Sequence, residues 1–175
     1  MVPPIRGHVV PFPALRASWC AMICPMDAMD RKMLAVLQAE GRISNAALAE
    51  RLHLSPSPCL RRMRALEQDG VIAGYRAVLD RQRVGIPMTV FVELKVDGHS
   101  DRTAAAISDA LLEAPEVIAA HIVSGSADFL LEVVVADLPA YERLLFDTLL
   151  RLPNVSDVRS NFALRTVKAP GPLPV

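Results

Sequence analysis

The chain has 175 residues, enough for one or two small domains, and its 52% hydrophobic and 22% charged content is ordinary for a soluble globular protein that needs no membrane. Three cysteines without a disulfide-framework spacing favour a reducing cytoplasm. The net charge of zero conceals an asymmetry, because residues 27–85 carry 10 Lys and Arg against 7 Asp and Glu, whereas residues 86–168 carry 7 against 12.

Residues 1–25 differ in composition from the rest of the chain. They hold five prolines and no long apolar run, and they lack the small-residue cleavage pattern of a secretory signal. We expect either a disordered arm or a start site assigned too early, with Met22 and Met26 as later possible starts. Cys20 and Cys24 have no histidine or second cysteine pair beside them, so we expect no metal site there.

Three helices are predicted between residues 27 and 70. Asp27 is suited to cap the first helix, which ends near Gly41. Ser44 can cap a second helix, and Ser55 can cap a third that has Pro56 at its first position, where the missing N–H costs nothing. The side chains that we expect to point inward are Met33, Leu34 and Leu37 from the first helix and Ala47, Leu48 and Leu52 from the second.

The third helix separates into an apolar and a polar face. At 100° per residue, one side carries Cys59, Leu60, Met63 and Leu66, and the other carries Ser57, Arg61, Arg64 and Gln68. Two short helices around a tight turn, with an arginine-rich second helix, are typical of a helix-turn-helix that reads DNA. The other interpretation is an amphipathic surface helix with solvated arginines. The candidate DNA contacts are Ser44, Asn45, Ser55, Ser57, Arg61, Arg62 and Arg64, of which Arg62 lies to the side and is assigned to phosphate.

The segment after Gly70 is predicted to connect two domains. Residues 71–79 are rich in branched and aromatic side chains and indicate a short strand or wing, so that the first domain spans residues 26–79. The polar run DRQRVG, ending before Pro87, indicates a linker over residues 80–86. An excess of three positive charges is small for a nucleic-acid binder acting alone, so we expect a dimer or a larger assembly.

Residues 87–168 are predicted to form a second domain in the order βαββαβ. A period-two pattern indicates a strand over 88–96, and helices are expected over 101–114 and 138–150 with strands over 117–123, 129–135 and 155–164. The repeat LLxxPxV, at 111–117 and 149–155, places a helix end before a strand in both halves. This order predicts a ferredoxin-like sandwich with a second subunit covering the sheet face that bears Phe91. The tail, residues 169–175, is expected to be disordered.

Residues 26–168 resemble the Lrp/AsnC family of transcription factors, the leucine-responsive and asparagine-responsive regulators. The stretch from Met26 to Tyr75 resembles the family's helix-turn-helix head, and HIVSGSADFLLEVVV, residues 121–135, resembles the hairpin of its effector domain. The resemblance implies an α+β protein with an N-terminal winged helix-turn-helix and a C-terminal ferredoxin-like domain for effector binding and oligomerisation. It also implies double-stranded DNA as a partner, and homodimers that assemble into tetramers or octamers.

The resemblance further implies a small effector, an amino acid, held where neighbouring dimers meet. The matching pocket residues are His121, Ser124, Gly125, Ser126, Asp128 and Phe129. Backbone N–H groups of the turn can hold a carboxylate, while the Asp128 carboxylate accepts from an ammonium group. There are alternatives for two of these residues. Asp128 also fits a turn residue at a strand entrance, and His121 also fits an ordinary strand histidine that does not contact a ligand. Ser126 and Ala127 replace a bulkier pair often found in this loop, which predicts a roomier pocket.

These patterns predict a sequence-specific, DNA-binding transcriptional regulator in the cytoplasm whose assembly or DNA affinity is biased by a small effector. The alternative is a constitutive nucleoid-organising protein that wraps DNA without a small-molecule switch. An enzyme is disfavoured, because His8, His53, His99 and His121 are scattered and the chain has neither a catalytic triad spacing nor a glycine-rich phosphate loop. We expect no metal and no cofactor.

Overall fold

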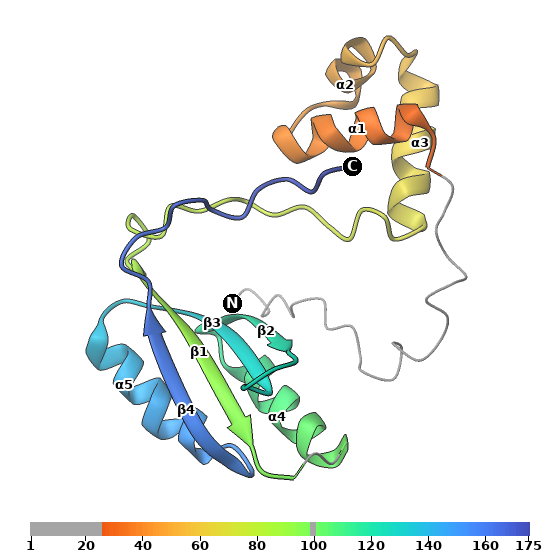
Figure 1. Cartoon of the computed structure of the whole chain (residues 1–175). Coiled ribbons are helices and arrows are strands. Elements are labelled where there is room, and N and C mark those ends of the chain that lie inside the picture. The colour runs from red at the N-terminus through yellow and green to blue at the C-terminus, as the bar shows by residue number, and fades with distance from the viewer. Residues whose placement is uncertain (1–25, 99–100) are drawn as a thin grey trace, which may run out of the picture. The chain divides into compact units, whose positions relative to one another are not determined.

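A computed structural model describes residues 26–98 and 101–175, which fall into two compact units (Figure 1). The N-terminal unit comprises residues 26–78 together with the tail 167–175, and the C-terminal unit comprises residues 79–166. The arm predicted over residues 1–25, with Cys20 and Cys24, lies outside the described residues.

The N-terminal unit contains the three predicted helices, α1 (Ala28–Ala39), α2 (Asn45–Arg51) and α3 (Pro56–Gln68). Asp27 caps α1 in a capping box, since its carboxylate accepts from the Asp30 N–H at 2.8 Å and the Asp30 carboxylate accepts from the Asp27 N–H at 3.1 Å. Ser44 caps α2 by accepting from the Ala47 N–H. Ser55 occupies the N-cap of α3 without a side-chain cap bond, and Pro56 follows at the first helical turn.

The three helices share one apolar core, and most of its members were predicted. It consists of Met33, Leu34, Leu37, Leu48, Ala49, Leu52, Cys59 and Leu66. Two inward positions were wrong: Ala47 is exposed while Ala49 is buried, and Leu60 is only partly buried. The seven-residue α2 is too short for its periodicity to decide which flank of Leu48 faces its neighbours. His53, at a φ of 54°, reverses the chain so that the Leu54 N–H reaches the Ala49 carbonyl oxygen.

The predicted strand or wing over residues 71–79 is not formed. Val71 and Ile72 pack against the three helices, and the Ile72 N–H bonds the Leu66 carbonyl oxygen at 3.0 Å. The Tyr75 hydroxyl donates to the Glu67 carboxylate, and the residues after it have no strand partner in the described part of the chain. Branched residues favour extended backbone, but a strand also requires a neighbouring edge to pair with.

The C-terminal unit has the predicted βαββαβ order: β1 (Met88–Val96), α4 (Asp101–Glu113), β2 (Val117–Ile122), β3 (Phe129–Val135), α5 (Leu138–Asp147) and β4 (Val155–Phe162). The sheet is antiparallel in the order β2-β3-β1-β4, which confirms the ferredoxin-like fold. The helix predicted to reach Leu150 ends at Asp147, because Thr148 leaves the helical conformation and a 3-10 turn, η2 (Leu149–Arg151), follows. The second and last strands each end slightly earlier than predicted, at Ile122 and Phe162.

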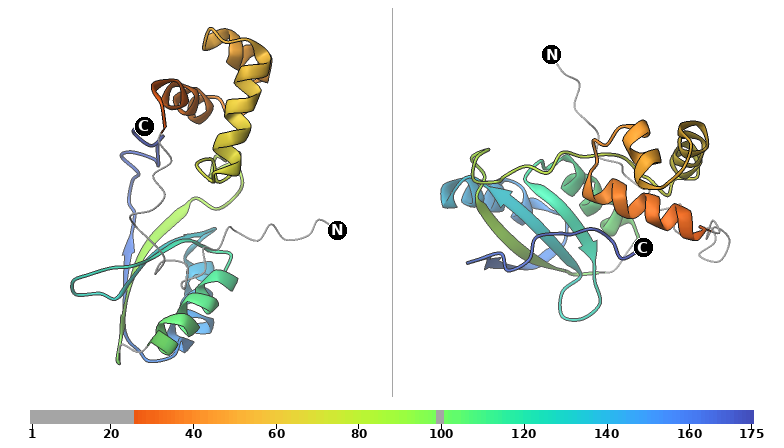
Figure 2. Two further views of the ribbon diagram at one scale, coloured as in Figure 1. Left: turned by 90° about the vertical axis from the view of Figure 1, so that its right-hand side faces the viewer. Right: turned by 90° about the horizontal axis from the view of Figure 1, so that it is seen from above.

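Helices α4 and α5 cover one face of this sheet (Figure 2). The side chains of Val90, Val92, Leu94 and Val96 point toward them, as the period-two pattern predicted, and pack with Ile107 and Leu111 of α4 and Tyr141 and Leu144 of α5. We call the opposite face the open face. Its register sets Phe91 beside Glu132 on one side and Asn161 on the other, so the open face combines an aromatic side chain with polar ones.

The predicted linker and the C-terminal tail both differ from expectation. The predicted linker is not extended: residues 80–86 form a hydrogen-bonded turn, in which the Val84 N–H reaches the Asp80 carbonyl oxygen and the Ile86 N–H reaches that of Arg81. The tail lacks helix and strand, but the Leu173 backbone exchanges two hydrogen bonds with the Gln38 side chain.

Candidate functional site: a recognition helix and a hairpin turn

The polar face of α3 has the arrangement predicted for DNA recognition. Ser57, Arg61, Arg64 and Gln68 line one shallow depression together with Leu60 and Ala65. Arg61 and Arg64 are exposed, and neither guanidinium has a hydrogen-bond or ion-pair partner within residues 26–98 and 101–175. Two planar groups of donors therefore project into solvent one helical turn apart. Such groups fit the O6 and N7 acceptors of guanine in the major groove.

The other predicted DNA contacts divide into free and engaged side chains. Ser55 is exposed and makes no cap bond, so its hydroxyl is available. Ser44 is partly committed, because its oxygen caps α2. Asn45 ties α2 to α3 by donating to the Pro56 carbonyl oxygen at 3.0 Å, while its own amide oxygen is buried without a partner. Asn45 therefore helps to hold α2 against α3, and its predicted contact with DNA stays a prediction.

Arg62 has a structural role that the sequence did not reveal. Its guanidinium contacts the Asp27 carboxylate at 2.6 Å and the Asp30 carboxylate at 2.8 Å, which ties α3 to the first turn of α1. This internal pairing is a second role for Arg62, and its predicted contact with phosphate stays a prediction. The spacing between Arg62 and the two carboxylates exceeds 30 residues, so no local pattern connects them. The paired carboxylates also hold the pKa of Arg62 above its usual value.

The pKa of Asp27 lies below its usual value of 3.8, first because the Asp30 N–H donates to the carboxylate and second because Arg62 does. A depressed native pKa contributes stability that is present above the unfolded value and is lost as the pH falls through the native pKa. We therefore expect acid below about pH 4 to destabilise wild type more than Asp27→Asn. Urea unfolding at pH 6 and pH 3 measures the two differences, and equal losses for both proteins would refute this linkage.

The hairpin turn between β2 and β3 is the second candidate site. Val123 and Asp128 close it, since the Val123 N–H donates to the Asp128 carbonyl oxygen at 3.0 Å. Ser124, Gly125 and Ser126 are exposed, and Gly125 has a φ of 121°, which side chains disfavour. The N–H groups of residues 124–127 have no hydrogen-bond partner among the described residues. Unpaired N–H groups at a turn form a concave site suited to a carboxylate.

The other three predicted effector residues, Asp128, Phe129 and His121, differ in their burial and in their partners. Asp128 anchors the hairpin to β1, because its carboxylate accepts from the Val96 N–H at 2.8 Å and its own N–H donates to the Leu94 carbonyl oxygen. Phe129 is buried in the core against the helices, and its predicted contact with the effector stays a prediction. His121 is exposed on the open face opposite Leu130.

Two residues that line the depression on α3 were not among the predicted DNA contacts. Gln68 was placed on the polar face but not counted as a DNA contact, and Leu60 was expected in the core. A helical-wheel count had the signal for Gln68, since it lies on the stripe of Arg61 and Arg64. The structure of residues 26–98 and 101–175 includes no cluster of three metal-ligating side chains and no helix long and apolar enough to cross a membrane.

Both units match known families. Residues 26–73 match a winged helix-turn-helix DNA-binding model, and residues 89–173 match the Lrp/AsnC ligand binding domain. The chain is 41% identical over 143 residues to the leucine-responsive regulatory proteins of Klebsiella pneumoniae and Escherichia coli K12, a match that covers 82% of this chain and 87% of each relative.

Solved structures agree with these matches. A Neisseria meningitidis transcriptional regulator in complex with L-methionine superimposes with a TM-score of 0.81 at 34% identity, over 85% of this chain and 96% of that one. An AsnC family regulator from Agrobacterium tumefaciens gives a TM-score of 0.81 at 38% identity, over 85% and 97%. Together with the recognition helix and the ferredoxin-like domain described above, these matches show that the chain belongs to the Lrp/AsnC family of DNA-binding transcriptional regulators.

Proposed function

We propose that this regulator reads DNA with the polar face of α3 and that an amino acid bound at the 124–127 turn biases its DNA affinity. The observation that carries the first part is the pair of unpartnered guanidinium groups, Arg61 and Arg64, on one exposed helix face. Bidentate contacts of this kind specify guanine, while the Ser55 and Ser57 hydroxyls at the start of α3 are suited to bases or phosphate.

Assembly of several copies supplies the positive charge that one copy lacks for binding DNA. The excess of three positive charges over residues 27–85 gives one copy only a weak attraction to phosphate, so at least two copies must act together. We infer that a second copy packs on the open face, where Phe91 is 41% exposed in the middle strand. Tetramers or octamers would extend the same arrangement. The buried free thiol of Cys59 suits a reducing cytoplasm, where we place the protein.

The effector proposal rests on the turn. Four N–H groups without a partner among the described residues can receive a carboxylate, and the Asp128 carboxylate, which already accepts from the Val96 N–H, follows them in the chain as the proposed acceptor for an ammonium group. The Neisseria relative that superimposes on this chain was solved with L-methionine, which makes an aliphatic amino acid the first class to test.

A thermal-shift screen against all twenty amino acids tests this proposal. At 100 times its dissociation constant, a ligand stabilises the folded state by roughly 2.7 kcal/mol, which moves the melting temperature by several degrees. Asp128→Asn is the informative variant, because the amide oxygen still accepts from the Val96 N–H while the charge is lost. We expect the variant to stay folded, with a cooperative thermal transition, and the ligand shift to disappear.

Asp157→Asn is the matched control, since it removes a carboxylate from β4 of the same domain and is expected to keep the full ligand shift. A ligand shift that persists in Asp128→Asn would contradict the ammonium role. One observation favours the alternative of a constitutive DNA-wrapping protein: the Asp128 carboxylate is already bonded within the chain. Absence of any shift, with DNA binding intact, would support that alternative.

A further inference from the structure

Arg81 holds the interdomain segment on the open face of the sheet. Its guanidinium donates to the Thr89 hydroxyl of β1 at 2.8 Å and to the Glu132 carboxylate of β3 at 3.0 Å. The two acceptors lie on neighbouring strands, so one side chain spans the β1–β3 pair. The Arg81 and Glu132 side chains are 35% and 23% exposed, so the ion pair is partly shielded from solvent and is stronger than a fully exposed one.

Burial at this end of the open face agrees with a docked segment. Thr89 and Val134 are register partners, and they point away from α4 and α5. Thr89 is nevertheless only 8% exposed and Val134 only 5%. Phe91, the next residue of β1 on the same face, is 41% exposed. The open face is therefore covered where Arg81 reaches it and uncovered farther along the strand.

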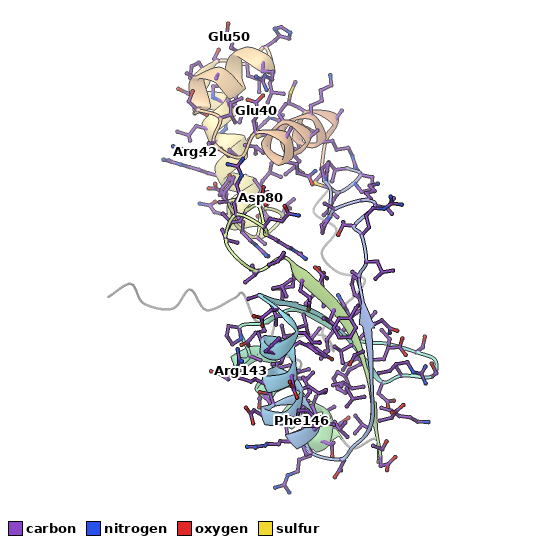
Figure 3. All side chains as sticks on the ribbon, turned by 90° about the vertical axis from the view of Figure 1, so that its left-hand side faces the viewer. Glu40, Arg42, Glu50, Asp80, Arg143 and Phe146 are labelled. Carbon is purple, nitrogen blue, oxygen red and sulfur yellow. The ribbon has the colours of Figure 1, made fainter. Side chains whose placement is uncertain are left out.

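The segment that carries Arg81 is itself folded. The Asp80 carboxylate accepts from the Gln82 and Arg83 N–H groups, and three backbone hydrogen bonds within residues 80–86 complete the turn. Figure 3 labels Asp80 where the chain enters the C-terminal unit. A preorganised turn loses little further entropy when its arginine docks, so the Arg81 contacts need only fix its position.

We propose that Arg81 determines the reach of the DNA-binding unit by clamping residues 80–86 to the sheet. With the clamp closed, the connection between the folded units is limited to residues 73–79, which span at most about 25 Å. With the clamp released, the turn of residues 80–86 keeps its own hydrogen bonds but is no longer held on the sheet, so the connection can lengthen by the length of the folded turn, to roughly 35 Å. One turn of DNA separates half-sites by roughly 34–36 Å, so the added reach is a sizeable fraction of the spacing that two recognition helices must match.

The consequence rests on the proposed function: an assembly with closed clamps selects half-sites by their spacing, and an assembly with released clamps tolerates a wider range. Arg81 and Glu132 thus act as specificity-determining residues without touching DNA. They do so as positioning residues, through the length of chain that they immobilise.

Hydrogen–deuterium exchange on the full-length chain tests the clamp itself. In Arg81→Gln and Glu132→Gln we expect the amides of residues 82–86 to exchange roughly tenfold faster than in wild type. Arg83→Ala is the matched control, because Arg83 lies on the same turn, is 87% exposed in its side chain and, among the described residues, pairs with Asp80 of the turn itself and not with the sheet. The charge exchange Arg81→Glu with Glu132→Arg is expected to restore part of the protection. Unchanged exchange in both single variants would overturn the proposal.

The second measurement uses a duplex selected by the wild-type protein from a random pool, with its half-sites then moved apart or together by one to ten base pairs. Wild type and Arg83→Ala are expected to lose affinity steeply away from the selected spacing, whereas Arg81→Gln and Glu132→Gln lose it gradually. Equal profiles would refute the role in specificity even if exchange rises. Failure of wild type to select any duplex would refute the proposed function instead, and the exchange result would still decide whether the clamp exists.

Discussion

Replacing both Arg61 and Arg64 by alanine is expected to lower the affinity for a selected duplex by about 2–6 kcal/mol, which is roughly 30-fold or more, because each bidentate contact to guanine contributes about 1–3 kcal/mol. The loss should be larger for the selected duplex than for random DNA, because base contacts rather than phosphate contacts are removed. Both side chains are exposed and unpartnered within the described chain, so the folded state should not change. Fluorescence anisotropy with both duplexes measures the two affinities.

A charge-matched control separates base recognition from simple loss of positive charge. Arg143→Ala with Arg151→Ala also removes two guanidinium groups, but from α5 and η2 of the other unit. The ion pair that this double variant breaks, between Arg151 and Asp147, is exposed and contributes little. Equal losses of affinity in the two double variants would contradict the assignment of α3 as the recognition helix.

Phe91→Arg is expected to convert the assembly into monomers and to lower DNA affinity with it. Phe91 lies in the middle of the open face, between Glu132 and Asn161 of the flanking strands. An arginine at the centre of a packed interface loses its hydration, and the neighbouring Glu132 carboxylate is already paired with Arg81. Central aromatic residues also carry much of the energy of such interfaces. Sedimentation at micromolar concentration should show a single species of about half the wild-type mass or less. Two linked recognition helices bind more tightly than one, so the monomer should bind the duplex at least tenfold more weakly.

Leu112→Arg provides the matched control, because Leu112 is 54% exposed on α4, on the far side of the sheet from Phe91. It introduces the same charge in place of an equally exposed apolar side chain. We expect it to leave the Phe91-dependent dimer intact. If Phe91→Arg kept the wild-type mass, a partner on the open face would be excluded.

Most of the fold was predictable, because its signals are local. Three helix starts are marked by local chemistry that does not depend on tertiary structure. Asp27 and Ser44 are capping residues, and Pro56 stands at the first position of α3. The period-two stripe from Val90 to Val96 identified the strand face that packs on the helices. The strand missing after Gly70 is a different case, since pairing depends on an edge that the segment itself does not supply.

The candidate site was less predictable, because its side chains have partners that are distant in the sequence. Arg62 was predicted to contact phosphate, and no local pattern indicated that it also pairs with Asp27 and Asp30. Arg81 lies in a run that is typical of a linker, yet Thr89 and Glu132 hold it on the sheet. Arg61 and Arg64, by contrast, lie on the exposed helix face where a helical-wheel count placed them, and their contact with DNA stays a prediction.

Asp128 shows why an effector contact is difficult to assign from a resemblance. The same carboxylate that is suited to an ammonium group also accepts from the Val96 N–H, and so holds the hairpin against β1. Replacing it by alanine would remove both roles at once and would leave a partly buried N–H unsatisfied. Asparagine keeps the structural bond and removes the charge, which is why it decides between the two roles.

The most direct test is whether an amino acid bound to the C-terminal unit changes the affinity of the N-terminal unit for DNA. The affinity of wild type for its selected duplex is measured by anisotropy with and without a saturating amount of L-methionine, and then of any amino acid that the thermal-shift screen identifies. A switch that acts by differential binding should change the DNA affinity by about 5- to 150-fold, and DNA should change the amino-acid affinity by the same factor. DNA affinity that stays the same under every amino acid would show that the 124–127 turn does not control the recognition helix.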